Sequence, residues 1–232
     1  KTNRIWEIDF LRGVAIIFMS LFHLLYDLSE FYKFNIDYTS GVIDLMGETS
    51  ALMFITLTGI SCSLSKNNLK RGLKILFFAL TITIVTYIYD VNTYINFGIL
   101  HLLGISILLH YLFRSLKTYQ LLLAGTIIII VGNIFSQLSV STNYLIPFGL
   151  TSPYYAALDY YPLLPYFGVF LYGMVLKNVF YPQKRSLFKS TFNDNLINML
   201  GRHSLFIYLT HQPVILAILF LQHKIGLLET FV

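Results

Sequence analysis

Five polar residues recur on one side of the first apolar segment, and their types suit proton transfer and the binding of a charged group. If residues 8–28 are helical, at about 100° per residue they fall within an arc of roughly 80°: Asp9, Arg12, Ser20, His23 and Asp27. The spacings i,i+3 and i,i+4 let opposite charges pair on a helix. An imidazole titrates near neutral pH, so a histidine on such a stripe is a natural proton acceptor.

The two ends of this stripe are separated along the helix axis. Arg12 and His23 are expected to lie about 16 Å apart along the axis and nearly in line. A donor anchored by its phosphates near Arg12 could therefore present its reactive end to His23. Two plainer interpretations stay open. Asp9 and Arg12 would be a charge pair that sets membrane orientation, and His23 and Asp27 would be a bonded core histidine and a helix end.

Further polar residues lie in other apolar segments. Ser204, Tyr208 and His211 fall on one face at helical spacing. Pro213 interrupts the backbone hydrogen bonding just beyond them, which inside a membrane often accompanies a cavity. Hydrogen bonding between helices is a strong alternative for Ser204 and Tyr208. His101 either completes a polar cavity or bonds a neighbour.

The composition indicates that these segments cross a membrane. Of the 232 residues, 56% are hydrophobic and 12% are charged, against roughly 25% charged in soluble domains, and the mean hydropathy is +0.68. A spanning helix needs about 20 mostly apolar residues. Suitable segments are 8–28, 49–65, 73–89, 97–113, 119–136, 163–180 and 203–222. We expect an all-α, polytopic transmembrane bundle of about seven spans, forming a single domain over residues 1–232.

Small residues in two of these segments favour packing over chemistry. They allow helices to approach closely, and they comprise Thr56, Thr58, Gly59, Ser61 and Ser63 in one segment and Gly168 and Gly173 in another. We therefore expect tight helix contacts at these positions.

The loops alternate in charge, which predicts the orientation of the bundle. The basic loops are 66–74, 114–118 and 177–202, and the acidic or neutral loops are 29–48, 90–96 and 137–162. Basic loops stay in the cytoplasm, so we expect the N-terminus inside and the C-terminus outside. This orientation argues against a seven-helix receptor, whose N-terminus lies outside. The dispersal of the cations along the chain argues against nucleic-acid binding.

The tyrosine-rich outer segment, residues 137–162, either dips into the membrane or packs as a lid.

The sequence offers no metal or nucleotide motif. No cluster of His, Cys, Asp and Glu has a recognised metal-ligand spacing, and the single cysteine, Cys62, excludes a thiolate cage. A glycine-rich loop of the soluble nucleotide-binding type is also missing from the sequence. We therefore expect no bound metal.

Several motifs, in their order along the chain, resemble a known enzyme family. E-I-D-F-L-R-G-V-A-I-I-F-M-S-L-F-H is similar to the first helix of the transmembrane acyltransferase superfamily, and its Arg12-x10-His23 spacing matches the acyltransferase-3 motif. Later segments resemble the heparan-α-glucosaminide N-acetyltransferase branch, particularly its small bacterial members. They are F-I-T-L-T-G-I-S, G-I-L-H-L-L-G-I-S, D-Y-Y-P-L-L-P-Y-F-G-V-F-L-Y-G and G-R-H-S-L-F-I-Y-L-T-H-Q-P-V. The likeness spans residues 4–213.

The resemblance implies an acetyltransferase of the bacterial plasma membrane. It would take acetyl from cytoplasmic acetyl-CoA and pass it to an amine or hydroxyl of an extracytoplasmic glycan or sugar. The heparan enzymes use a histidine in the loop after the first helix, whereas residues 29–47 contain none, so His23 would take that role. His23, oriented by Asp27, would deprotonate the acceptor or carry the acetyl group, with His211 as a further catalytic candidate.

The remaining site hypotheses concern the donor and the partners. The expected donor-binding residues are Asp9, Arg12, Lys70, Arg71, Lys74 and His101. The lipid bilayer surrounds the chain, and a homodimer is left open.

A transporter of protons or a small anion would use the same intramembrane charges, with flux but no donor consumption. A non-catalytic assembly partner of a glycan pathway is a third hypothesis.

Overall fold

The structure is a computed structural model that describes residues 5–188 and 195–226, and this part of the chain is almost entirely helical. Its α-helices are α1 (Trp6–Tyr32), α2 (Gly41–Leu64), α3 (Asn68–Tyr89), α4 (Ile99–Phe113), α5 (Thr118–Phe135), α6 (Leu163–Phe180), α7 (Leu196–Arg202) and α8 (Ser204–Lys224). A short 3-10 helix, η1 (Ile146–Phe148), precedes α6. The strand-like pairing in the described residues is one isolated bridge between Ser139 and Thr151. The all-α prediction is confirmed.

Six of the described helices are long and apolar enough to cross a membrane: α1, α2, α3, α5, α6 and α8. The remaining predicted span, residues 97–113, corresponds to α4, which is apolar but only 15 residues long. The chain is therefore a multi-pass membrane protein whose helices match the seven apolar segments of the sequence.

Two helical regions lie where the sequence suggested loops. Helix α2 begins at Gly41, directly after a turn in which Asp37 accepts hydrogen bonds from the backbone N–H of Thr39 and the hydroxyls of Thr39 and Ser40. Helix α7 begins after Asn195, whose side chain accepts the backbone N–H of Asn198. Hydropathy marks the membrane-crossing part of a helix, whereas local turn and cap residues influence where the helix starts.

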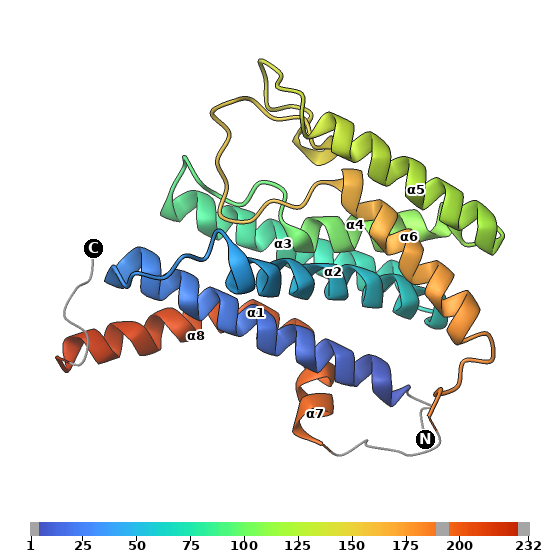
Figure 1. Cartoon of the computed structure of the whole chain (residues 1–232), viewed down its shortest axis with the longest axis horizontal. Coiled ribbons are helices and arrows are strands. Elements are labelled where there is room, and N and C mark those ends of the chain that lie inside the picture. Colours follow the sequence, from blue (N-terminus) through green and yellow to red (C-terminus); the bar gives the residue numbers. More distant parts are fainter. Residues whose placement is uncertain (1–4, 189–194, 227–232) are drawn as a thin grey trace. The chain divides into compact units, whose positions relative to one another are not determined.

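The chain forms two compact units. The first contains Lys1–Phe54 and Arg185–Val232, and the second contains Ile55–Lys184. The boundary between them falls within α2. In the first unit, α7 packs on the beginning of α1 and α8 packs on its later part, as Figure 1 shows for the blue and red helices.

The first unit holds α7 against α1 by direct backbone contact. A Cβ atom added at Gly201 would overlap the carbonyl oxygen of Asp9, and one added at Gly13 would overlap that of Ile197. The start of α1 is also tied to the segment before α7. The buried Glu7 carboxylate accepts hydrogen bonds from the Ser186 hydroxyl at 2.9 Å and the Leu187 N–H at 2.6 Å.

Glycines allow the helices of the second unit to pack equally closely. A Cβ at Gly59 of α2 would overlap the carbonyl oxygen of Phe170, and one at Gly173 of α6 would overlap that of Thr56. Gly168 of α6 lies against the Gly125 carbonyl of α5, two helices that pack side by side in Figure 1. The predicted packing role of Gly59, Gly168 and Gly173 is confirmed.

The tyrosine-rich segment 137–162 is bonded to its own unit. The hydroxyl of Tyr160 donates to the carbonyl of Ile146 at 2.8 Å. The backbone N–H of Leu158 donates to Thr93, and that of Tyr161 donates to Phe97. These two backbone bonds attach the residues that precede α6 to the segment that precedes α4.

Candidate functional site

Helices α1 and α8 bring two histidines of the first unit into contact, with their rings tilted against each other. The ring centroids of His23 and His211 are 4.8 Å apart, with an angle of 56° between the planes. Both residues are partly buried. His23 makes a further ring contact with Phe22, and among the described residues no hydrogen bond engages its imidazole nitrogens. The two histidines were separate sequence candidates, and the structure places them together.

The hydrogen bond of His211 fixes which of its nitrogens carries the proton. Its Nδ1 lies 2.6 Å from the carbonyl oxygen of Tyr208. A carbonyl only accepts, so Nδ1 is the donor, and a neutral ring then keeps the lone pair on Nε2. That Nε2 is enclosed by protein and has no hydrogen-bond partner among the described groups. Nε2 of the neutral ring has no proton to donate, so it cannot stabilise an oxyanion by a hydrogen bond. It is suited to act as a base.

Asp27 is fully buried, with 0% of its surface exposed, at the level of this pair. Its two carboxylate oxygens accept hydrogen bonds from Nε2 of Gln212, at 2.8 and 2.9 Å. The i,i+4 spacing led us to expect that Asp27 would orient His23, but the described hydrogen bonds of Asp27 go to α8 instead. An amide reaching across from the facing helix offers the carboxylate a hydrogen-bond donor, and His23 turns its ring toward His211.

Sequence reasoning did not single out Gln212. The available signal was its position in H-Q-P, directly after His211 and before Pro213, in the middle of an apolar helix. A glutamine amide in a membrane helix is costly unless it is bonded. Its partner, however, lies on a helix that is far away in sequence.

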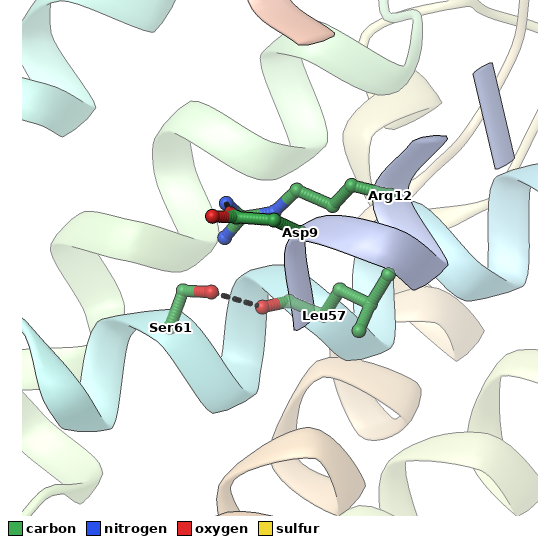
Figure 2. Close-up of polar contacts among 4 residues, drawn as sticks. All are labelled: Asp9, Arg12, Leu57 and Ser61. Atoms are coloured by element: carbon green, nitrogen blue, oxygen red, sulfur yellow. Dashed lines mark hydrogen bonds and ion pairs between the residues drawn. The ribbon is translucent and has the colours of Figure 1, made fainter. Parts of the chain in front are cut away.

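The other end of the α1 stripe carries an ion pair. Arg12 Nη1 lies 3.5 Å from Asp9 Oδ1, and the two side chains retain 20% and 13% of their exposure. Figure 2 shows both side chains extending to the same side of the α1 ribbon, with their charged ends together. The pair therefore has the i,i+3 spacing that the sequence predicted, and both side chains are partly buried.

In the second unit, His101 has both ring nitrogens hydrogen-bonded. The Gly98 N–H donates to Nδ1 at 3.2 Å, and Nε2 lies 3.1 Å from the Thr83 hydroxyl. Asp159 accepts the N–H of Ile99 at 3.0 Å at the same helix end. These bonds favour a structural role for His101 at the start of α4, in place of the expected contact with a donor.

The three cations expected to meet donor phosphates lie in the first two turns of α3. Lys70 and Lys74 are exposed and Arg71 is half-buried. Lys74 also lies 5.9 Å over the ring of Phe78. They belong to the second unit, whereas Asp9 and Arg12 belong to the first.

The serines near the end of α2 are bonded within their own helix. The Ser61 hydroxyl donates to the carbonyl of Leu57 at 2.6 Å, drawn as a dashed line in Figure 2. Ser63 similarly donates to Gly59 at 3.3 Å. Within residues 5–188 and 195–226, no group of three or more His, Cys, Asp and Glu side chains is arranged to hold a metal ion.

The comparison with known proteins supports the family resemblance that the sequence motifs indicated. The family model described as heparan-α-glucosaminide N-acetyltransferase, catalytic, matches residues 4–213. That range includes α1 with its polar stripe and extends along α8 to Pro213. Neither a curated protein nor a solved structure matches the chain.

Proposed function

The chain belongs to the heparan-α-glucosaminide N-acetyltransferase catalytic family, a family of membrane acetyltransferases, and from that premise we propose that it moves acetyl from cytoplasmic acetyl-CoA to a sugar outside the cytoplasm. The acceptor group is an amine or hydroxyl of a glycan or sugar. The membrane is the plasma membrane of a bacterium. The placement of the donor inside and the acceptor outside is supported by the alternation of basic and acidic loops along the sequence.

One observation carries the proposal: the facing imidazoles of His23 and His211, 4.8 Å apart. Acyl transfer needs a group that accepts a proton from the incoming nucleophile. His211 Nε2 is suited to this, because its ring is fixed through Nδ1 and its lone pair meets no described protein donor. His23, whose nitrogens are not used by described protein groups, is suited to receive the acetyl group.

The reaction then proceeds in two displacements. A ring nitrogen of His23 attacks the thioester carbonyl, the carbon–sulfur bond breaks, and the thiolate leaves with the imidazole proton as free thiol. The acceptor next attacks acetyl-His23 and gives its proton to Nε2 of His211. Breaking the carbon–nitrogen bond releases the acetylated sugar and restores the His23 ring, which takes back the proton.

Charged residues at two places support binding of the donor. Asp9 and Arg12 lie before His23 on α1, and a guanidinium recognises phosphate well. Separately, in the second unit, the exposed Lys70 and Lys74 at the start of α3, with Arg71 between them, are further candidates for contact with CoA phosphates. The helical rise predicts about 16 Å between Arg12 and His23, a distance that an extended pantetheine arm can cover.

The test follows an acetyl-labelled donor in protein purified in detergent. The wild type should release thiol and become labelled without acceptor, and should pass the label to amino sugars when they are added. We expect His23→Ala to abolish labelling of the protein. His211→Ala should still be labelled but should transfer about 10²–10⁴-fold more slowly, the usual contribution of a general base.

A matched control is available on the same helix. His223 lies near the end of α8, where its ring contacts Tyr32 instead of the histidine pair, so His223→Ala should retain both steps. Acetyl transfer by a folded His23→Ala variant would contradict the role of His23. A wild type that moves protons or anions in proteoliposomes without releasing thiol would instead support the transporter hypothesis.

A further inference from the structure

The side-chain amide of Gln212 has one end fixed and the other end unused. Its Nε2 lies 2.8 and 2.9 Å from the two carboxylate oxygens of Asp27. A carboxylate accepts hydrogen bonds but donates none, so this contact decides which end of the amide faces Asp27. The other end, Oε1, is enclosed by protein and has no hydrogen-bond partner among the described groups.

The preceding residue of α8 presents a second atom in the same condition. Nε2 of His211 is also enclosed and meets no described protein donor. Buried polar atoms in proteins are nearly always hydrogen-bonded. Two unpartnered acceptors on consecutive residues, held through His23 and Asp27 against neighbouring turns of α1, therefore indicate a binding place for a ligand that brings hydrogen-bond donors.

The number of donors distinguishes an amine from a hydroxyl. A neutral amine has two N–H groups, so it has one donor for Gln212 Oε1 and one for His211 Nε2, and it keeps its lone pair for attack. A hydroxyl has one hydrogen, and when His211 accepts it, the oxygen of Gln212 is left buried without a donor. The amine therefore gains a hydrogen bond to a buried acceptor that the hydroxyl does not make, which favours binding of the amine.

We propose that Gln212 recognises the acceptor group and selects an amine over a hydroxyl, and that Asp27 is the positioning residue that turns the amide for this purpose. The inference rests on the proposed function, because it takes His211 as the base. It adds a specificity-determining residue on α8 and gives the buried Asp27 carboxylate a role through Gln212 instead of through His23.

The experiment compares two sugars that differ only in the group at carbon 2. Glucosamine and glucose are each supplied with acetyl-CoA to the purified full chain, and N- and O-acetyl products are separated by the alkaline lability of esters. For the wild type we expect kcat/KM to be about tenfold or more higher for glucosamine, the effect of one unsatisfied buried acceptor. Equal use of the two sugars would overturn the inference.

The variant Gln212→Met removes the amide while keeping the length of the side chain. It should lower kcat/KM for glucosamine by about tenfold or more, leave glucose nearly unchanged, and preserve thiol release without acceptor. Gln222→Met, the same change on the same helix, is the control and should keep the preference. A folded Gln212→Met variant with the wild-type preference would refute the assignment.

A double variant covers the case in which Gln212→Met does not fold. In Asp27→Asn with Gln212→Glu, the amide moves to α1 and the carboxylate to α8, so the contact between the helices is kept and one carboxylate oxygen still faces the acceptor. The double variant should retain the preference for the amine, and loss of that preference would count against the proposal.

A wild type that acetylates neither sugar and releases no thiol would overturn the proposed function, whereas equal acetylation of both sugars would overturn this inference alone.

Discussion

At the scale of single residues, the α1 stripe divides into two chemically different ends. In the Asp9–Arg12 pair, Nη1 of Arg12 lies 3.5 Å from Oδ1 of Asp9, and both side chains are mostly buried. A guanidinium matches the geometry of phosphate as well as that of carboxylate, so a donor phosphate is a suitable further partner for Arg12. The His23–His211 end has no carboxylate between the rings, which suits proton transfer better than the binding of an anion.

Arg12→Leu should therefore weaken donor binding without blocking the chemistry. We expect KM for acetyl-CoA to rise about tenfold or more, since a hydrogen bond to a charged group is worth about 1.5–3 kcal/mol, with a smaller change in kcat. Arg12→Lys should recover part of the affinity. Initial rates over a range of donor concentrations measure both constants. Lys224→Ala, at the end of α8, serves as the control, and an unchanged KM in Arg12→Leu would contradict the donor role.

At the scale of helices, the start of α4 depends on a carboxyl group from outside the helix. Asp159 accepts the N–H of Ile99, and burial raises the pKa of its carboxyl from 3.8 to about 6. A raised pKa means that the fold favours the protonated form. The contribution to stability is therefore complete below about pH 3.8 and is lost as the pH rises through about 6.

Replacing Asp159 by Asn should remove this pH dependence while keeping an acceptor for Ile99. The thermal unfolding temperature in detergent should decline less for Asp159→Asn than for the wild type between about pH 4 and about pH 6.5. Asp90→Asn is the matched control, because the Thr93 hydroxyl holds the pKa of the Asp90 carboxyl below its usual value. That change should leave the decline in place. An identical slope in wild type and Asp159→Asn would refute this account.

The helices could be predicted from the sequence, whereas the contacts between them could not. Long apolar runs are required by the thickness of the membrane, so each predicted segment lies on a helix. The starts at Gly41 and Leu196 were missed because turn and cap residues, not hydropathy, determine them. His23 and His211 were recognised separately from helical periodicity, but their contact and the bond from Gln212 to Asp27 depend on how α1 and α8 cross.

At the scale of the whole molecule, the described surface is that of a membrane protein. Large apolar side chains are widely exposed on the membrane-crossing helices, among them Ile88 at 78% and Phe77 at 66% on α3. Soluble monomers rarely expose extended apolar patches, and lipid provides the matching solvent. The family match over residues 4–213 assigns the chain to a family of membrane acetyltransferases.

The orientation of the chain can be tested with its one cysteine removed. In a Cys62→Ser background, Lys66→Cys and Asn92→Cys introduce thiols at exposed positions on either side of α3. A maleimide that does not cross membranes should label Asn92→Cys in intact cells and Lys66→Cys only after permeabilisation. The opposite pattern would reverse the orientation and move the donor side of the proposed reaction.

The contact between α1 and α7 has a consequence for genetics. Every single-base change of a glycine codon that alters the residue adds a Cβ atom, and neither Gly13 nor Gly201 has room for one. A random mutagenesis screen for lost acetyltransferase activity should therefore recover many hits at these two codons, although neither glycine takes part in the chemistry. Such alleles would be misread as catalytic unless protein abundance in the membrane is measured beside activity.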